Sequence, residues 1–257
     1  MVRDDIDGGV RSVATAVNLL DCFLDDEELG VSEVARRLGV AKSTAHRALT
    51  TLAAGGLIEQ NPATGKYRLG IHLFELGHLA LSRVELRRQS KTLLEELREA
   101  SGWMVHLAVA SGSDTLYLER LPTLRGMQAM GEYRRRWPLH ATSSGKVICA
   151  YDPIAAQARI QAGFPKYAAY TIDSEAMFRD ALVRIRQQGY AAANNELMVG
   201  LSSVAAPVLD QQGFARGAIS ITGSTQEFLQ HQDRQVRLVI AAAKRLSQVT
   251  GRRSSAG

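Results

Sequence analysis

Apolar positions near the start of the chain recur every three to four residues, which is the spacing of an amphipathic helix. The first such series predicts a helix that begins near Ser12. Its members are Val13, Val17, Leu20 and Leu24. An acidic run over 25–28 then interrupts the pattern. We expect this run to be a solvated loop, because it lacks the glycine and the later glutamate of a calcium-binding loop.

A turn separates the next two helical segments. Ser32 is a favourable N-cap for the first, and Gly39 can adopt the positive φ that a tight turn needs. The second segment predicts a helix over 42–54 with a stripe of Ala and Leu on one face. Its other face carries Ser, Thr, His and Arg in place of the Glu–Lys pairs of an ordinary surface helix. Such groups can donate hydrogen bonds to phosphates and base edges.

Two short apolar stretches, 57–60 and 66–69, flank a turn that contains Pro62 and Gly65, which predicts a β-hairpin. A helix, a helix-turn-helix and a hairpin, in that order, form a winged helix-turn-helix domain. The segment 31–70 is also basic, with six Lys or Arg residues against two acids. This is the charge pattern of a nucleic-acid-binding surface, although charge alone leaves open a merely solvated face.

The rest of the chain changes between helical and strand periods. The segment 71–84 is apolar on nearly every side, so we expect a linker helix that packs against another domain or another chain. A more amphipathic helix is predicted over 85–100. Alternation predicts strands over 103–109, 115–121, 126–130, 199–209 and 214–222. Helical spacing predicts helices over 142–150, 153–162, 174–188 and 225–250. This order of elements favours an α+β domain.

Composition excludes several classes of protein. The 257 residues are 46% hydrophobic and 22% charged, with a net charge of +5, which is ordinary for a globular chain. Cys22 and Cys149 form no CxxC pair, so we expect neither a disulfide framework nor a cysteine-based zinc site, and a reducing cytoplasm is the simplest setting. No stretch approaches ~18 consecutive apolar residues. The six histidines lack metal-ligand spacing, and no metal or cofactor is expected.

Several runs of residues resemble the IclR-type transcriptional regulators. In the first part of the chain they are VSEVARRLGVAKSTAHRALTTLAAGGLIEQ and KYRLG. In the second part they are TLYLER, WPLHATSSGKVICA, RQQGYAAANNE and VGLSSVAAPVLDQQGFARGAISITG. The resemblance implies an α+β protein, in which a winged helix-turn-helix is joined by a linker helix to a C-terminal GAF-like effector-binding domain. It also implies a homodimer, often a dimer of dimers, that binds a double-stranded DNA operator.

Pattern and resemblance together predict the domain organisation. We expect a flexible arm over 1–9 and a DNA-binding domain over 10–70. A linker and dimerisation helix over 71–84 leads to an effector-binding domain over 85–250 and a flexible tail over 251–257. The predicted function is that of a transcriptional repressor whose affinity for the operator changes when an effector binds. No enzymatic activity is expected.

The second helix of the turn motif enters the major groove with its N-terminal residues first. We expect Arg47 to contact a guanine in bidentate fashion and Lys42 and Ser43 to hold phosphates. Ser32 at the start of the preceding helix and Lys66 in the wing are expected to contact the DNA backbone. The full predicted set is Ser32, Lys42, Ser43, Thr44, His46, Arg47 and Lys66.

The run 140–146 predicts a helix N-terminus, whose free N–H groups attract carboxylates, although the pattern by itself favours a plain helix cap. Gly145 is expected to leave space for a close approach. The resemblance places this helix start and two late strands around an effector. The implied pocket residues are Trp137, Ser143, Ser144, Leu201, Ser203, Ser220 and Thr222. The flat wall of Trp137 favours an aromatic or otherwise apolar-bodied small acid, or a derivative of one.

Two departures and two alternatives accompany these predictions. Related chains often carry acids where this one has the stretch 193–195, and often a cysteine in place of Ser203. The basic run 134–136 is open to two interpretations, recruitment of an acid or a solvated loop. Ser143 and Lys146 have the spacing of serine–lysine acyl-transfer enzymes, but the companion motifs are absent. A DNA-binding protein with a purely structural C-terminal domain is the other alternative.

Overall fold

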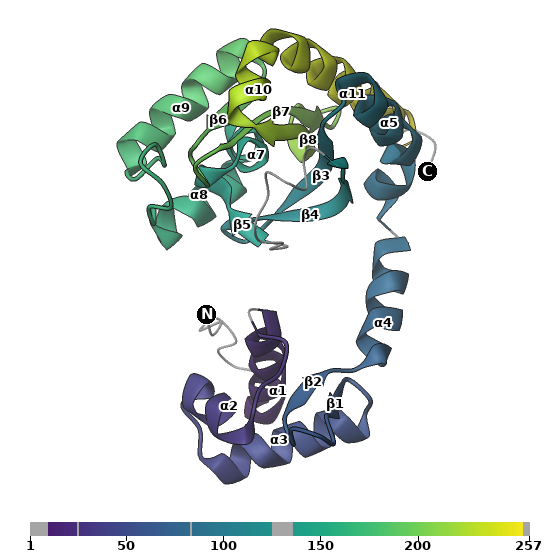
Figure 1. Cartoon of the computed structure of the whole chain (residues 1–257), viewed down its shortest axis with the longest axis vertical. Helices are drawn as coiled ribbons and strands as arrows, with labels where there is room; N and C mark the ends of the chain where they lie inside the picture. The colour runs from purple at the N-terminus through teal and green to yellow at the C-terminus, as the bar shows by residue number, and fades with distance from the viewer. Residues whose placement is uncertain (1–9, 25, 83, 125–135, 254–257) are drawn as a thin grey trace. The chain divides into compact units, whose positions relative to one another are not determined.

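The computed structural model describes residues 10–24, 26–82, 84–124 and 136–253. The chain divides into two compact units, Met1–Arg83 and Val84–Gly257. Both are drawn in Figure 1. The predicted strand 126–130 and the arginines at 134 and 135 lie outside the described residues. None of the described helices is long and apolar enough to cross a membrane.

The first unit is a winged helix-turn-helix. Its helices are α1 Arg11–Asp21, η1 Cys22–Leu24, α2 Val31–Leu38, α3 Lys42–Ala54 and α4 Ile71–Ser82. Its strands are β1 Ile58–Gln60 and β2 Tyr67–Leu69. The core between them contains the buried Leu19, Val34, Leu49, Ile58 and Tyr67. The predicted helix 42–54 and the hairpin are therefore confirmed.

The apolar face predicted for the first helix is confirmed only in part, since Leu20 packs against the core. Val13 and Leu24 are 59% and 62% exposed, whereas Leu19 and Phe23 are buried. The chain tightens to a 3₁₀ turn at Cys22–Leu24, so the positions that face the core no longer follow a single 3.6-residue period.

The predicted cap of the second helix is also wrong, while the turn after it is confirmed. The N-cap of α2 is Gly30, with extended backbone, and no side chain caps the helix. Ser32 is exposed and lies inside the first turn. Gly39 ends the helix in the left-handed conformation at φ 63°, which glycine adopts without strain.

The second unit contains a six-stranded antiparallel sheet in the order β5-β4-β3-β8-β7-β6. The strands are β3 Met104–Ser111, β4 Asp114–Leu121, β5 Arg136–Pro138, β6 Ala191–Asn194, β7 Leu201–Leu209 and β8 Ala215–Ser224. The helices are α5 Glu85–Ser101, η2 Leu139–Ala141, α7 Ser143–Tyr151, α8 Pro153–Ala162, α9 Glu175–Gln188, α10 Thr225–Gln230 and α11 Gln232–Arg253.

Helices cover both faces of this sheet (Figure 1). Alternate residues of β7 show how: Val204 and Val208 join the core beneath α5 and α11, whereas Ala205 joins the core with α7 and α9. On the second face the sheet presents small residues, including Ala191 and Ala218. Small side chains let α7 approach the strands closely, and every residue from 143 to 150 in α7 is buried.

One prediction for the second unit needs correction, and two strands were missed. The helix predicted over 225–250 is two helices, because the backbone breaks at His231. Strands β5 and β6 were not expected from the pattern. The first contains Pro138 and the second consists mainly of alanine, and both residue types are poor strand formers.

Candidate nucleic-acid interface and ligand pocket

The exposed face of α3 carries the side chains that the sequence assigned to DNA. Lys42, Ser43, Thr44, His46 and Arg47 are all exposed. The N-cap of α3 is an alanine, and no side chain caps the first N–H groups of the helix. These groups are therefore open to a phosphate acceptor.

Two hydroxyls on the same face are already used within the helix. Thr50 Oγ1 donates to the carbonyl of His46, and Thr51 Oγ1 donates to that of Arg47, both at 2.9 Å. This back-bonding removes their donors, so the polar face available to a partner lies in the first half of α3.

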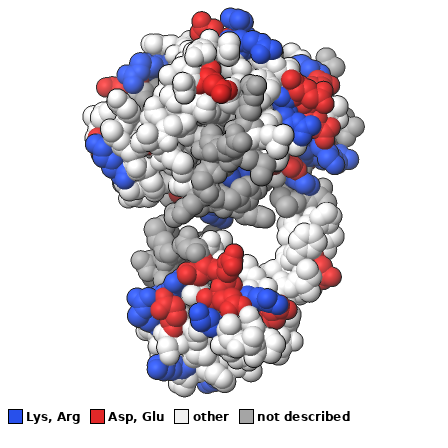
Figure 2. All heavy atoms as spheres, viewed as in Figure 1, with Lys and Arg blue, Asp and Glu red and all other residues white. Residues whose placement is uncertain are grey.

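Ion pairs divide the basic residues of the first unit into two groups. Arg36 and Arg37 both bind Glu33, Arg37 also binds Asp26 at 2.6 Å, and Arg68 binds Glu59 at 2.6 Å. Acidic and basic side chains are accordingly interleaved over much of the surface in Figure 2. Among the residues that the structure describes, no acid pairs with Lys42, Arg47 or Lys66, and these three stand at the start of α3 and in the wing.

The described part of the acidic run before α2 is a loop, as predicted, and Glu28 within it also binds the wing. Glu28 accepts hydrogen bonds from Asn61 Nδ2 at 2.5 Å and Thr64 Oγ1 at 2.9 Å, and these bonds lower the pKa of its carboxyl. Leu29 exchanges two backbone hydrogen bonds with Tyr67, both at 2.9 Å. The wing is thus attached to the segment before α2 as well as to its own strands.

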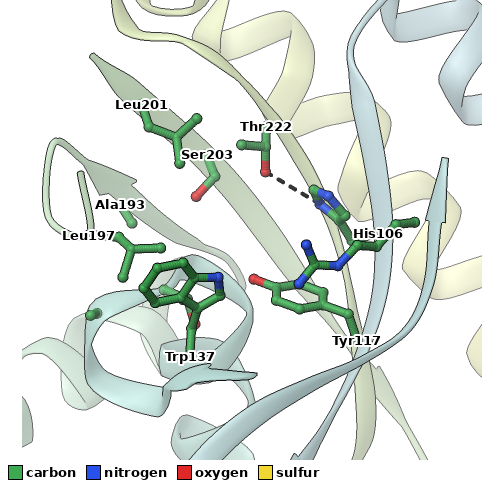
Figure 3. Close-up of a pocket in the computed structure, with 11 residues that line it drawn as sticks. His106, Tyr117, Trp137, Ala193, Leu197, Leu201, Ser203 and Thr222 are labelled. Atoms are coloured by element: carbon green, nitrogen blue, oxygen red, sulfur yellow. Dashed lines mark hydrogen bonds between the residues drawn. The ribbon is translucent and has the colours of Figure 1, made fainter. Parts of the chain in front are cut away.

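The second unit contains a cavity of about 30 Å³ between the sheet and the segment that leads into α7. Its described lining residues are His106, Tyr117, Arg120, Trp137, Ala141, Thr142, Ala193, Leu197, Leu201, Ser203 and Thr222. Figure 3 shows Trp137, Leu197 and Ala193 on one side and His106, Tyr117 and Thr222 on the other. The space has room for about two water molecules, so a larger ligand enters only if a wall moves.

The start of α7 closes one end of the pocket. Thr142 caps the helix, because its Oγ1 accepts a hydrogen bond from the amide of Gly145 at 3.0 Å. Ser143 Oγ and Ser203 Oγ share a hydrogen bond at 2.8 Å. Ser144 is buried, and its hydrogen bond with the Tyr117 hydroxyl works to lower the pKa of that hydroxyl.

The space expected beside Gly145 is occupied by the protein itself. A Cβ at this position would lie 2.6 Å from Thr115 Oγ1 and would overlap the backbone of Leu139. Gly145 therefore permits α7 to pack closely against η2. The atoms that lie against Gly145 belong to the protein and not to a ligand.

A β-bulge determines the polar half of the pocket. Ala108 pairs with Tyr117, but Leu107 pairs with Glu119, which leaves an extra residue in β4. The extra residue shifts the alternation by one position, so Tyr117 and Arg120, three apart in sequence, face the same side. The guanidinium carbon of Arg120 lies 4.2 Å from the centre of the Tyr117 ring, a cation–π contact.

His106 completes this polar half. Its Nδ1 lies 3.5 Å from both Ser220 Oγ and Thr222 Oγ1, and its ring centroid is 5.0 Å from that of Tyr117. Burial, helped by the charge of Arg120, lowers the pKa of His106 to about 3, so the imidazole is neutral. Burial also raises the pKa of the Tyr117 hydroxyl, while Arg120 and nearby hydroxyls partly oppose this effect.

Four of the seven sequence-derived pocket residues line the cavity, namely Trp137, Leu201, Ser203 and Thr222. The other three lie just behind it. Ser143 contacts Ser203, Ser220 contacts His106, and Ser144 is buried on α7. Sequence reasoning missed His106, Tyr117 and Arg120. The run TLYLER contained two of them, but the bulge that turns both inward leaves no mark on the pattern.

A buried ion pair lies beside the pocket. Lys146 Nζ donates to both carboxylate oxygens of Glu196, at 2.6 and 2.5 Å, and to the carbonyl of Ala192 at 2.7 Å. Burial lowers the pKa of Lys146 and raises that of Glu196, and each group's charge opposes the shift of the other. This pair attaches α7 to the segment that carries Leu197, one wall of the cavity.

Two family descriptions match the sequence. Residues 12–62 match the IclR helix-turn-helix domain, and residues 78–248 match the bacterial transcriptional regulator IclR C-terminal domain. Together they account for both units of the structure.

Named relatives support the same assignment. HTH-type transcriptional regulator XynR of Escherichia coli strain K12 is 34% identical over 84% of this chain and 87% of its own length. Transcriptional repressor IclR of the same organism is 26% identical over 95% of this chain and 91% of its own. A solved IclR homologue from Microbacterium hydrocarbonoxydans, complexed with 4-hydroxybenzoate, matches with a TM-score of 0.77 at 26% identity, covering 92% of this chain and 98% of that one. The chain belongs to the IclR family of DNA-binding transcriptional regulators, with a helix-turn-helix domain followed by a C-terminal effector domain.

Proposed function

We propose that this chain is an effector-controlled repressor that acts in the cytoplasm. Its first unit binds a double-stranded operator, and its second unit binds a small organic acid, or a derivative of one, that changes the affinity for that operator. The observation that carries the DNA-binding half is the position of Lys42, Arg47 and Lys66 at the start of α3 and in the wing, where they form no ion pair with a described acid.

The proposed contacts divide into positioning and base reading. Lys42, Ser43 and Lys66 hold phosphates, and Arg47 reads a guanine. Thr44 and His46 are exposed on α3, where they lie between Ser43 and Arg47 in the sequence. Ser32 is exposed in the first turn of α2, where a helix N-terminus favours a phosphate.

The pocket of the second unit supports the organic-acid half. Trp137 and Leu201 provide apolar walls, and Ser203 and Thr222 provide hydroxyls. Apolar walls with a few convergent polar groups are characteristic of sites for small ligands. The compound complexed with the Microbacterium relative, 4-hydroxybenzoate, is an aromatic acid of this kind.

Regulation requires an element that joins two chains. Helix α4 carries apolar side chains that are exposed in the single chain, including Ile71 at 74%, Phe74 at 69% and Leu79 at 56%. Such a helix is expected to be covered by another copy, so we propose a homodimer, or a dimer of dimers, assembled through α4. A ligand then shifts the balance between two dimer geometries, because it binds them with different affinity.

The contacts of Lys146 argue against the acyl-transfer alternative. A serine–lysine mechanism needs the amine free to accept the serine proton. Here Lys146 Nζ is held by Glu196 and by the carbonyl of Ala192, while Ser143 Oγ is hydrogen-bonded to Ser203. The arrangement favours a structural role for Lys146.

Thermal unfolding of the full chain with a panel of small acids tests the effector half. A ligand at ~100 times its dissociation constant adds ~2.7 kcal/mol to the stability of the unit that binds it. We expect at least one apolar-bodied acid to raise the unfolding midpoint and to change operator affinity. A panel without any shift would favour the alternative of a purely structural C-terminal domain.

A further inference from the structure

The cavity of the second unit is too small for the ligand that its walls favour. Its volume is about 30 Å³, which is room for about two water molecules, whereas sites for small organic molecules are typically many times larger. A small organic acid therefore enters only after one wall has moved. The elements that carry the lining residues show which wall is free to do so.

One wall belongs to no helix or strand. Among the described lining residues, all but two lie on strands or in η2. The first exception, Thr142, caps α7. The second, Leu197, lies in the segment 195–200, which connects β6 to β7 and which we call the strap. Figure 3 shows Leu197 next to the indole of Trp137, so the strap closes the apolar side of the cavity.

The backbone of the strap is suited to movement. Its first residue, Asn195, has a φ of 54°, and its last, Gly200, has a φ of 86°. Between them, the amides of residues 196–199 donate no hydrogen bond to a described carbonyl. Its outer side faces solvent, since Val199 is 80% exposed. Few backbone hydrogen bonds are lost when such a segment lifts, so it opens at a low free energy compared with the strands on either side.

Side chains hold the strap closed at three points. Glu196 pairs with Lys146 of α7 through both carboxylate oxygens. The carbonyl of Glu196 accepts a hydrogen bond from Thr171 Oγ1, in the loop before α9. Asn195 Oδ1 accepts another from Thr225 Oγ1, at the start of α10, at 3.0 Å. None of these five residues lines the cavity, so the tethers can be altered while the walls stay the same.

We propose that the strap is the lid of the effector pocket, and that it lifts, withdrawing Leu197 from Trp137, to admit a small organic acid. Its ends at Asn195 and Gly200 are the hinges, and the contacts of Asn195 and Glu196 are the latches. This inference rests on the proposed organic-acid function and adds the route by which the ligand enters. Because the closed form excludes the ligand, the opening of the strap limits the rate of binding.

A thiol inside the cavity measures this opening without any ligand. Ser203 lines the cavity, and cysteine is close to serine in size. Ser203→Cys is made in the full chain together with Cys22→Ser, and the variant is treated with N-ethylmaleimide, a neutral reagent too large for the closed cavity. Mass spectrometry of the peptides gives the labelling rate at each thiol. The native Cys149, which is fully buried in α7, reports any general unfolding of the unit.

The first latch variant is Asn195→Gly, because glycine keeps the positive φ while the hydrogen bond from Thr225 is lost. We expect the introduced thiol to react about three- to tenfold faster, which is the effect of losing a hydrogen bond that holds the closed form. The labelling rate of Cys149 should not change. An equal rise at Cys149 would show that the whole unit has loosened, and would overturn the assignment to the strap.

The second latch variant is Glu196→Gln, which weakens the pair with Lys146. Charge-assisted hydrogen bonds are the stronger class, so we expect labelling to rise by about tenfold or more. Glu96→Gln is the matched control, because it makes the same change in the ion pair with Arg245, which joins α5 to α11. This control should leave the labelling rate as it is.

Binding kinetics test whether the strap admits the acid. Benzoate, 4-hydroxybenzoate and phenylacetate are each mixed rapidly with the full chain, and tryptophan fluorescence is followed, since Trp137 lines the cavity. For an acid that binds, we expect the observed rate to reach a plateau as its concentration rises, because opening becomes limiting. Asn195→Gly should raise this plateau by about threefold or more.

The outcomes separate the strap from the organic-acid function. If the introduced thiol reacts as fast as an exposed thiol, or if both latch variants leave a slow reaction unchanged, the strap is not the lid. An acid that binds with the same plateau in the wild type and in Asn195→Gly enters by another route, which also overturns the proposal. If the latch variants speed labelling but no acid of the panel binds, the opening of the strap is supported and the organic-acid function fails.

Discussion

His106 on β3 and Arg120 on β4 are paired directly across the sheet, so a buried imidazole faces a fixed positive charge. Burial is the main cause that lowers the pKa of His106 to about 3, and the positive charge of Arg120 is the second cause. His140, in η2, has a pKa lowered to about 4, again mainly by burial. Both histidines are neutral in the folded protein at physiological pH.

These two histidines make the second unit sensitive to acid. In the unfolded chain a histidine binds a proton near pH 6.5, whereas the folded protein does so only near pH 3 to 4. The unfolded state therefore binds more protons between these values, and the free energy of unfolding falls as the pH drops below about 6.5. Denaturant titrations at pH 7 and pH 5 should show this loss, and His106→Gln should reduce it. If the free energy of unfolding falls equally with pH in His106→Gln and in the wild type, the assignment of this acid sensitivity to His106 is contradicted.

Arg47 and Lys66 should have different effects on DNA binding. Arg47→Ala is expected to lose ~1–3 kcal/mol of discrimination at one base pair of the operator. Lys66→Ala should weaken binding to all sequences alike and lower the slope of affinity against salt by about one. Anisotropy titrations of operator variants at several salt concentrations measure both. Arg36→Ala is the control, because Glu33 already neutralises Arg36.

Glu28 should influence DNA binding without touching DNA. Its hydrogen bonds to Asn61 and Thr64 hold the wing turn, and Glu28→Ala releases them. We expect the affinity for all duplexes to fall by about threefold, because the wing must then be ordered on binding. Glu27→Ala removes an exposed neighbouring charge and serves as the control. A rise of the same size in both variants would indicate a general charge effect instead, because removing an acid lessens the repulsion of the phosphates.

Gly145 should be essential to the packing of α7. A Cβ there overlaps the backbone of Leu139, which cannot move as a side-chain end can. Gly145→Ala is expected to lower the free energy of unfolding by ~1–3 kcal/mol or more. Gly77→Ala in α4 meets no atom within 4 Å and should cause no loss. Chemical denaturation of the two variants gives the comparison, and an unperturbed Gly145→Ala would rule out the close contact.

The parts of the fold that were predictable from the sequence are those in which one local pattern dominates. Helix α3 combines an alanine–leucine stripe with glycines on either side, and its predicted bounds agree with the structure. Strand β6, by contrast, is held by its pairing with β7, and four residues of alanine and asparagine give no local sign of it.

The candidate site residues show the same division. The exposed position of Arg47 could be predicted from helical periodicity because α3 is regular. Arg120 could not, because a bulge opposite Leu107 and Ala108 decides which way it faces, and bulges are set by pairing between strands. Likewise, the acidic partners of Arg36, Arg37 and Arg68 emerge only in the structure, and they show which cations of the first unit are already neutralised.

Equilibrium binding of the full chain to its own upstream DNA, beside a scrambled duplex of the same length and composition, is the most direct test of the account. We predict affinity for the upstream segment at least about 10³-fold above that for the scrambled duplex at physiological salt, which is the low end of specific recognition. Affinities that are equal for the two duplexes, with and without small organic acids, would contradict the assignment of α3 and the wing as an operator-reading surface.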